Sequence, residues 1–246
     1  MFKALSETID AYGRALGMIT KHGLIKYMIV PGLISLGVMF GLVGGLWTWF
    51  TNSSVEQWLI DLWPFEWGVG AIEAIASILA LLLLMVSIFF LAKYIVMVIV
   101  SPFMGSLSEK VEAIVTGKKE PSTSNFISDL IRGLRIALRN VFWELFLTVI
   151  LLFANLIPVI GSIAALVLTF MVQSYYAGFG SMDYTLERKH YGIRDSVNFV
   201  RTHRWTAMGN GSIFLLIFLI PVAGWFLAPA FATVAGTVVV LKRLKA

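Results

Sequence analysis

The sequence predicts an all-α integral membrane protein with two long transmembrane helices, two re-entrant helical hairpins and cytoplasmic amphipathic helices. Hydrophobic residues make up 59% of the 246 residues and charged residues only 13%, with a mean hydropathy of +0.86, outside the range of ordinary soluble domains. Residues 74–92 form an uncharged run of nineteen that contains twelve Leu, Ile, Val or Phe. Such a run covers the ~30 Å hydrocarbon core as a helix. The net charge is +5, and the basic residues flank apolar segments. This placement indicates that the positive charges orient the protein in the membrane and do not bind nucleic acid.

The amino-terminal region predicts an interfacial helix followed by the first spanning helix. Apolar residues recur at helical spacing in residues 1–22, with charged residues between them. Gly23 breaks this pattern, and residues 24–50 are apolar apart from Lys26. Pro31 lies one to two turns into this stretch, so we expect a kink or a broken start there.

The charge distribution predicts the orientation. Residues 51–73 contain four acidic residues and no Lys or Arg. Tryptophans gather around the same loop, as aromatic residues do at a membrane surface. The positive-inside rule therefore places this loop outside and both termini in the cytoplasm, with residues 71–100 as the second spanning helix.

Residues 101–140 turn polar and predict a cytoplasmic helical pair. Residues 104–116 read as an amphipathic helix, residues 117–124 as a turn, and residues 125–140 as a second helix that carries three arginines. The whole chain, residues 1–246, is expected to form a single membrane domain.

The remaining apolar sequence contains an internal repeat that predicts two hairpins, in residues 141–180 and 211–241. The segment LIPVIG of residues 156–161 recurs as LIPVAG in residues 219–224. Proline followed by glycine is turn chemistry, so each copy is expected at a hairpin tip. The arms are short, with ten residues from 211 to 220, and segments of 10–14 apolar residues favour re-entrant hairpins over full spans.

Enzyme chemistry finds no support in the motifs. The chain contains no cysteine, which excludes thiol catalysis and cysteine-ligated metal, and it lacks the phosphate-binding loop, the HExxH motif and the GxSxG motif. Its three histidines are spaced unlike metal ligands. We therefore expect no enzyme activity, no metal and no cofactor. The GxG of residues 178–180 is better explained by close helix packing than by a dinucleotide.

The start of the first spanning helix is a candidate anion site. Helix-start N–H groups lack intrahelical acceptors, and the helix dipole favours negative charge. Gly23 opens the helix and Lys26 adds a cation within the first turn. The alternative is that a glycine followed by a lysine at a cytoplasmic helix end serves topology alone.

Three further residues are pathway candidates. Lys93 is flanked by apolar sequence on both sides, which makes it a functional candidate, although snorkelling to the interface is the competing account. Glu144 is either its partner or a carboxylate at headgroup level. Arg132, with its neighbouring arginines, either lines an entry vestibule or contacts anionic lipid.

The ordered pattern resembles the CysZ family of bacterial sulfate permeases, which belongs with the etoposide-induced-protein-like membrane proteins. The resemblance rests on Gly23-Leu24-Ile25-Lys26 with Pro31 beyond it, on the two LIPVxG tips, and on the Ser101-Pro102-Phe103 segment followed by Leu107, Glu109, Glu112 and a Thr116-Gly117 turn. It extends from about residue 10 to 240.

This resemblance implies an oligomer in the bacterial inner membrane that passes sulfate inward for cysteine biosynthesis. It also implies a sulfate site at Gly23, Leu24, Ile25 and Lys26. In the family this stretch reads Gly-Leu/Ile-Arg-Arg, so here Ile25 removes one charge and Lys26 replaces a bidentate guanidinium with an ammonium. Both a channel-like path and proton coupling fit these residues.

Two other function classes remain open at this point. Two shallow hairpins and an interfacial helix would suit a membrane-shaping or scaffolding protein without transport. A lipid-modifying enzyme is the weaker alternative, because no nucleophile, base and orienting group can be assembled from the sequence.

Overall fold

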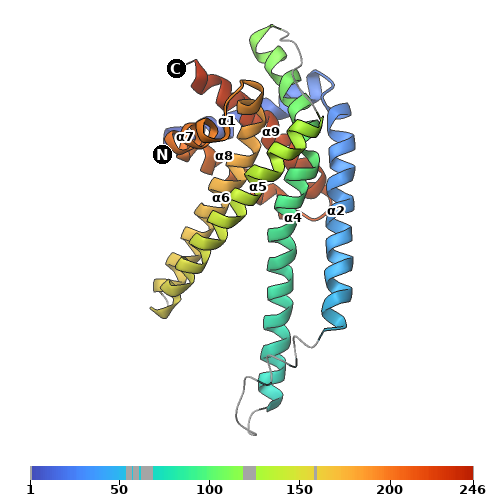
Figure 1. Cartoon of the computed structure of the whole chain (residues 1–246), viewed down its shortest axis with the longest axis vertical. Helices are drawn as coiled ribbons and strands as arrows, with labels where there is room; N and C mark the ends of the chain where they lie inside the picture. Colours follow the sequence, from blue (N-terminus) through green and yellow to red (C-terminus); the bar gives the residue numbers. More distant parts are fainter. Residues whose placement is uncertain are drawn as a thin grey trace. The chain divides into compact units, whose positions relative to one another are not determined.

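The computed structural model describes residues 2–53, 57, 61, 69–118, 126–157 and 160–245, and every regular element in these residues is helical (Figure 1). The elements are α1 (Phe2–Lys21), α2 (Ile25–Thr51), α4 (Val69–Thr116), α5 (Phe126–Leu152), the 3-10 helix η1 (Phe153–Leu156), α6 (Ile160–Arg188), α7 (Ile193–Thr202), α8 (Arg204–Phe218) and α9 (Ala223–Leu244). Four helical segments among the described residues are long and apolar enough to cross a membrane: α2, Glu73–Thr116 of α4, α6 and α9. The predicted all-α membrane class is confirmed.

The chain folds into two compact units. The first comprises Met1–Ser35 and Val96–Ala246, and the second comprises Leu36–Ile95. The second unit therefore contains the later part of α2 and the earlier part of α4. The first unit contains the hydrophobic cluster around Phe179 and Met182, both with 0% exposure.

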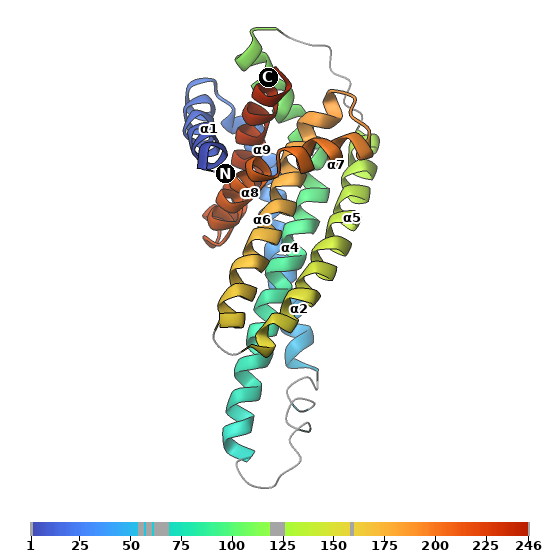
Figure 2. The same cartoon turned by 90° about the vertical axis from the view of Figure 1, so that its left-hand side faces the viewer.

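Helix α6 lies at the centre of the first unit, where it packs against α5, α8 and α9 (Figure 2). Its crossing with α8 requires two glycines. A Cβ atom at Gly178 would lie 1.8 Å from the Ala207 carbonyl oxygen, and one at Gly211 would lie 1.8 Å from the Ser174 carbonyl oxygen. The expectation that helix packing explains the glycine at position 178 is confirmed.

The two predicted hairpin tips share one backbone hydrogen bond and one close approach, although residues 158 and 159 of the first tip lie outside the described residues. Gly161 N donates to Ile157 O at 3.0 Å, and Gly224 N donates to Ile220 O at 2.9 Å. At each glycine a Cβ atom would lie 1.9 Å from the carbonyl oxygen seven residues earlier. Both copies of the repeat therefore place a glycine where a side chain would clash with the backbone of the preceding helix.

Two helices continue where the sequence suggested separate elements. Helix α4 runs unbroken through Pro102 to Thr116, and α5 runs unbroken from Phe126 past residue 140 to Leu152. Proline removes the N–H that would bond the carbonyl four residues earlier. The hydroxyl of Ser101 donates to that carbonyl, Val98 O, at 2.8 Å, which supplies the missing donor and keeps α4 helical.

Helix α1 matches the predicted amphipathic helix and packs against α8 and α9. The Tyr12 hydroxyl donates to Asn210 O at 2.9 Å. At the other end of the contact, Glu7 pairs with Lys242 and Arg243 of α9. These contacts fix α1 to the carboxyl-terminal helices.

Candidate functional site

The start of α2 has the geometry of a tight helix-to-helix turn. Gly23 has φ +63°, a left-handed conformation that glycine adopts without cost. A Cβ atom at Gly23 would meet nothing within 4 Å, so the backbone angle and not the space requires glycine here. Leu24 is buried at 2% exposure and accepts a hydrogen bond from Tyr27 N at 2.9 Å. The helix begins at Ile25, two residues after Gly23.

Two ammonium groups lie beside this helix start. The Lys26 Nζ is 5.4 Å from the centroid of the Tyr27 ring, and the Lys110 Nζ, from α4, is 5.9 Å from the same centroid. Both distances are within the range of cation–π attraction. Ile25 is 53% exposed and adds no charge. The structure therefore brings a second cation to the predicted site, from a residue that lies 84 positions later.

Lys110 is a site residue that the sequence pattern does not reveal. It lies inside an amphipathic segment of mixed charge, and only its position three residues after Leu107 in a helix indicates which face it occupies. Nothing local to Lys110 points toward residues 23–26. Such a pairing depends on how α2 and α4 meet.

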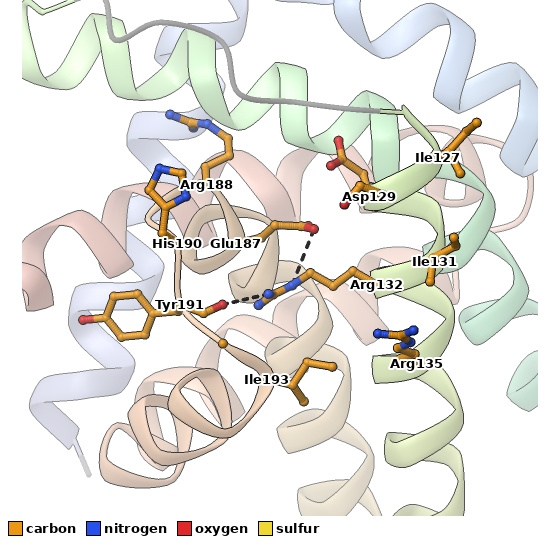
Figure 3. Close-up of a pocket in the computed structure, with 12 residues that line it drawn as sticks. Ile127, Asp129, Ile131, Arg132, Arg135, Glu187, Arg188, His190, Tyr191 and Ile193 are labelled. Atoms are coloured by element: carbon orange, nitrogen blue, oxygen red, sulfur yellow. Dashed lines mark hydrogen bonds and ion pairs between the residues drawn. The ribbon is translucent and has the colours of Figure 1, made fainter.

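Arg132 is the centre of a different arrangement, and Figure 3 shows its contacts with Glu187 and Tyr191. Its Nε and Nη2 donate to the two oxygens of Asp183 at 3.1 and 3.0 Å. Its Nη1 donates to Tyr191 O at 2.7 Å, and Nη2 also donates to Ser196 Oγ at 3.0 Å. Glu187 Oε1 lies 3.6 Å from its Nε. The N–H groups of the guanidinium are thus bonded to acceptors within the protein, and these bonds join α5 to α6 and α7.

Burial alone would lower the pKa of Arg132, but the hydrogen bonds and charge of Asp183, with the charge of Glu187, raise the pKa above its ordinary value. The guanidinium is therefore held as a cation. Its charge is matched by carboxylates of the protein. An anion that passed here would have to compete with them.

A second buried ionic cluster joins α4 to α6. Glu112, with a side chain 3% exposed, lies 2.5 Å from both Arg188 Nη2 and Lys189 Nζ. Arg188 Nη1 also donates to Ser108 Oγ at 3.0 Å. The Ser108 hydroxyl in turn lies 3.0 Å from Thr185 and 3.1 Å from Thr237, so three hydroxyls close a ring between α4, α6 and α9.

The remaining pathway candidates are buried. Lys93 is 1% exposed, and its Nζ lies 5.2 Å from the Phe90 ring centroid and 4.7 Å from that of Tyr94. This enclosure differs from the snorkelling account, in which the ammonium reaches an exposed surface. Glu144, on α5, is 0% exposed. In the described residues, no group of three acidic or histidine side chains is placed to hold a metal ion.

These observations define a multi-pass helical membrane protein in which two lysines lie near one tyrosine ring at the start of α2. The family model described as "Sulfate transporter CysZ/Etoposide-induced protein 2.4" matches residues 11–229. The chain belongs to this family.

Curated relatives extend over nearly the whole chain. Proteins named "Sulfate transporter CysZ" from Pseudomonas paraeruginosa strain PA7 and from Pseudomonas aeruginosa strains LESB58 and PAO1 are each 28% identical to it over 229 residues. Each match covers 91% of this chain and 89% of the relative. The family predicted from the residues is confirmed.

Proposed function

We propose that this protein carries sulfate across the bacterial inner membrane and so supplies sulfur for cysteine biosynthesis. Membership of the sulfate transporter family supports sulfate as the substrate, and the four apolar helices support a membrane location. The observation that carries the assignment of a site is the convergence of Lys26 and Lys110 on Tyr27, at the start of α2.

The proposed site binds the anion at Gly23, Leu24, Ile25 and Lys26. The first-turn N–H groups of a helix are hydrogen-bond donors without intrahelical acceptors, and they carry the positive end of the helix dipole. Two lysines provide two positive charges, which matches the charge of sulfate. Lysine binds as a point charge and not as a planar fork, so we expect this site to hold its anion loosely enough for release.

We also propose that the route of the anion through the protein is influenced by Lys93, Glu144 and Arg132. Lys93 is the strongest of the three, because its ammonium is enclosed by aromatic rings within an apolar helix. The proposal includes a homo-oligomer, cytoplasmic termini and re-entrant hairpins that dip in from the cytoplasmic side. Each of these follows from the sequence pattern and the family resemblance.

Radiolabelled sulfate uptake into proteoliposomes tests this function, with sulfite, thiosulfate, phosphate and chloride as competitors. We expect Lys26→Ala and Lys110→Ala each to weaken sulfate binding about tenfold, because a charged hydrogen-bonding group contributes ~1.5 kcal/mol. Lys3→Ala, at the exposed far end of α1, is the matched control and should leave uptake unchanged.

Different outcomes test the proposed anion site and the proposed transport activity separately. Normal uptake in the Lys26→Ala, Lys110→Ala double variant would exclude the site and leave transport standing. Vesicles that contain folded protein but admit no oxyanion would exclude transport. If the same protein reshaped the vesicles, the membrane-shaping alternative would replace it.

A further inference from the structure

Helix α5 carries an exposed apolar face that no element of the described chain covers. Along its first five turns this face comprises Ile127, Ile131, Leu134, Leu138, Phe142 and Leu145, each between 45% and 66% exposed. Their spacing of three or four residues places them on one side of the helix. The opposite side of α5 packs inward, where Gly133 contacts the Ser101 side chain of α4.

A cavity of about 820 Å³ opens at the amino-terminal end of this face. Its walls come from the first three turns of α5, from the end of α6, and from the connection to α7. Ile127 and Ile131 belong to both the cavity and the apolar face. The volume falls within the range of small-molecule sites, roughly 300–1,000 Å³. A ligand in the cavity would therefore continue directly onto an apolar surface.

The charges of the cavity leave one cation available. Arg132 is occupied by Asp183 and Glu187, and Arg188 is occupied by Glu112. Arg135 also lines the cavity, is exposed, and makes no ion pair within the described part of the chain. Figure 3 shows it on α5, one turn beyond Arg132.

The carboxylates near Arg135 do not neutralise it. Asp129 is buried at 7% exposure and has its own contacts, and Glu187 faces Arg132. A single guanidinium beside exposed isoleucines provides a fork for phosphate oxygens next to a surface for hydrocarbon. A phospholipid matches this arrangement, because its negatively charged phosphodiester would meet the guanidinium and its acyl chain would meet the isoleucines.

We propose that this cavity binds an anionic glycerophospholipid, with its phosphate on Arg135 and one acyl chain along the apolar face of α5. The site is separate from the start of α2 and does not depend on the anion proposed there. It would place a specific lipid against the helix that Arg132 ties to α6 and α7.

Fluorescence quenching in nanodiscs tests this site. The chain has no cysteine, so a single Leu138→Cys change allows one fluorophore to be attached on the apolar face beyond Arg135. Quenching by phosphatidylglycerol with brominated acyl chains is compared with quenching by brominated phosphatidylcholine, each in a phosphatidylcholine bilayer. We expect about a fivefold preference for the anionic lipid, the contribution of one basic residue near the surface.

Two controls isolate the site. Arg135→Gln should abolish the preference, whereas Arg14→Gln, at an exposed arginine of α1, should preserve it. A label at Leu216→Cys, which is an exposed apolar position on α8, should show no preference. All variants are compared for thermal stability, so that loss of the fold is not read as loss of the lipid.

Several results would overturn the proposal. Equal quenching by the two lipids at position 138, or a preference that survives Arg135→Gln, would exclude a phosphate site. Displacement of the lipid by millimolar sulfate or inorganic phosphate would identify the cavity as a site for free oxyanion. Energy transfer between labels on two copies, together with weak lipid quenching, would assign the face to a contact between protein chains.

Discussion

At the scale of single residues, the arginines of α5 have different roles although they lie close together in sequence. Arg132 has a side chain 15% exposed and binds Asp183, which is 5% exposed. Arg135 is exposed, and Arg139 lies 5.5 Å from the Phe179 ring centroid. Their shared charge therefore does not indicate a shared function, because burial and partners differ at each position.

Replacing Arg132 with alanine should destabilise the protein strongly. The change leaves Asp183 buried without its bidentate partner, and breaking a buried ion pair costs about 3 kcal/mol. Thermal unfolding in detergent should show a clear fall in melting temperature. Arg135→Ala, on the same helix but exposed, should change stability by less than ~0.5 kcal/mol. Equal stability of the two variants would contradict the network described for Arg132.

At the scale of elements, the crossing of α6 and α8 is determined by two glycines. Gly178 and Gly211 each face a carbonyl of the other helix at a separation that excludes a side chain. Interiors are close-packed and do not absorb an added methyl group without movement. The backbone approach of these two helices therefore sets the geometry of the first unit.

Gly178→Ala should force α6 away from α8, because the new Cβ would lie 1.8 Å from Ala207 O. Overpacking of this kind costs about 3 kcal/mol or more. Gly13→Ala is the matched control, since nothing lies within 4 Å of its Cβ position. That change should stabilise α1 by ~0.5–1 kcal/mol through helix propensity. Unfolding curves for both variants measure the contrast, and a harmless Gly178→Ala would disprove the close crossing.

The docking of α1 on α9 should depend on pH. The hydrogen bond from Lys242 lowers the pKa of Glu7, and the charge of Arg243 adds to this effect, while partial burial opposes it. A lowered pKa in the docked state means that the contribution is complete above the ordinary value of 4.5 and is lost as pH falls through the lowered pKa.

Hydrogen exchange of α1 amides, corrected for intrinsic rates, measures this docking. We expect protection to fall below about pH 4 in the natural sequence. In Glu7→Gln, the free energy of opening of α1 that exchange reports should fall at neutral pH by no more than ~1 kcal/mol, because Lys242 is exposed. Protection in that variant should not change with acid. Asp10→Asn, at an exposed position of α1, should behave like the natural sequence. Acid sensitivity that persists in Glu7→Gln would assign the effect to another group.

At the scale of the whole molecule, the orientation in the membrane and the depth of the hairpins can be tested with single cysteines in this cysteine-free chain. Ser53→Cys should react with an impermeant maleimide from outside the cell, and Lys245→Cys only from the cytoplasmic side. Ile157→Cys and Ile220→Cys, at the two tips, should react from neither side, because re-entrant tips end within the hydrocarbon core. Tips that react from outside would show that the hairpins are full spans.

The sequence by itself determined the membrane class, the ends of α1 and α2, and the two hairpin tips. These features follow from composition, helical periodicity and the conformations of glycine and proline, all of which act within a few residues. It also located the basic helix start at Lys26.

Only the tertiary structure decided which distant residues meet. Lys110 reaches Tyr27 from α4, Arg132 finds Asp183 on α6, and Gly178 faces Ala207 on α8. These partners are separated by about 30 to 80 positions, and local patterns carry no information about such pairs. Long-range pairing depends on how helices pack, and therefore on the three-dimensional fold as a whole.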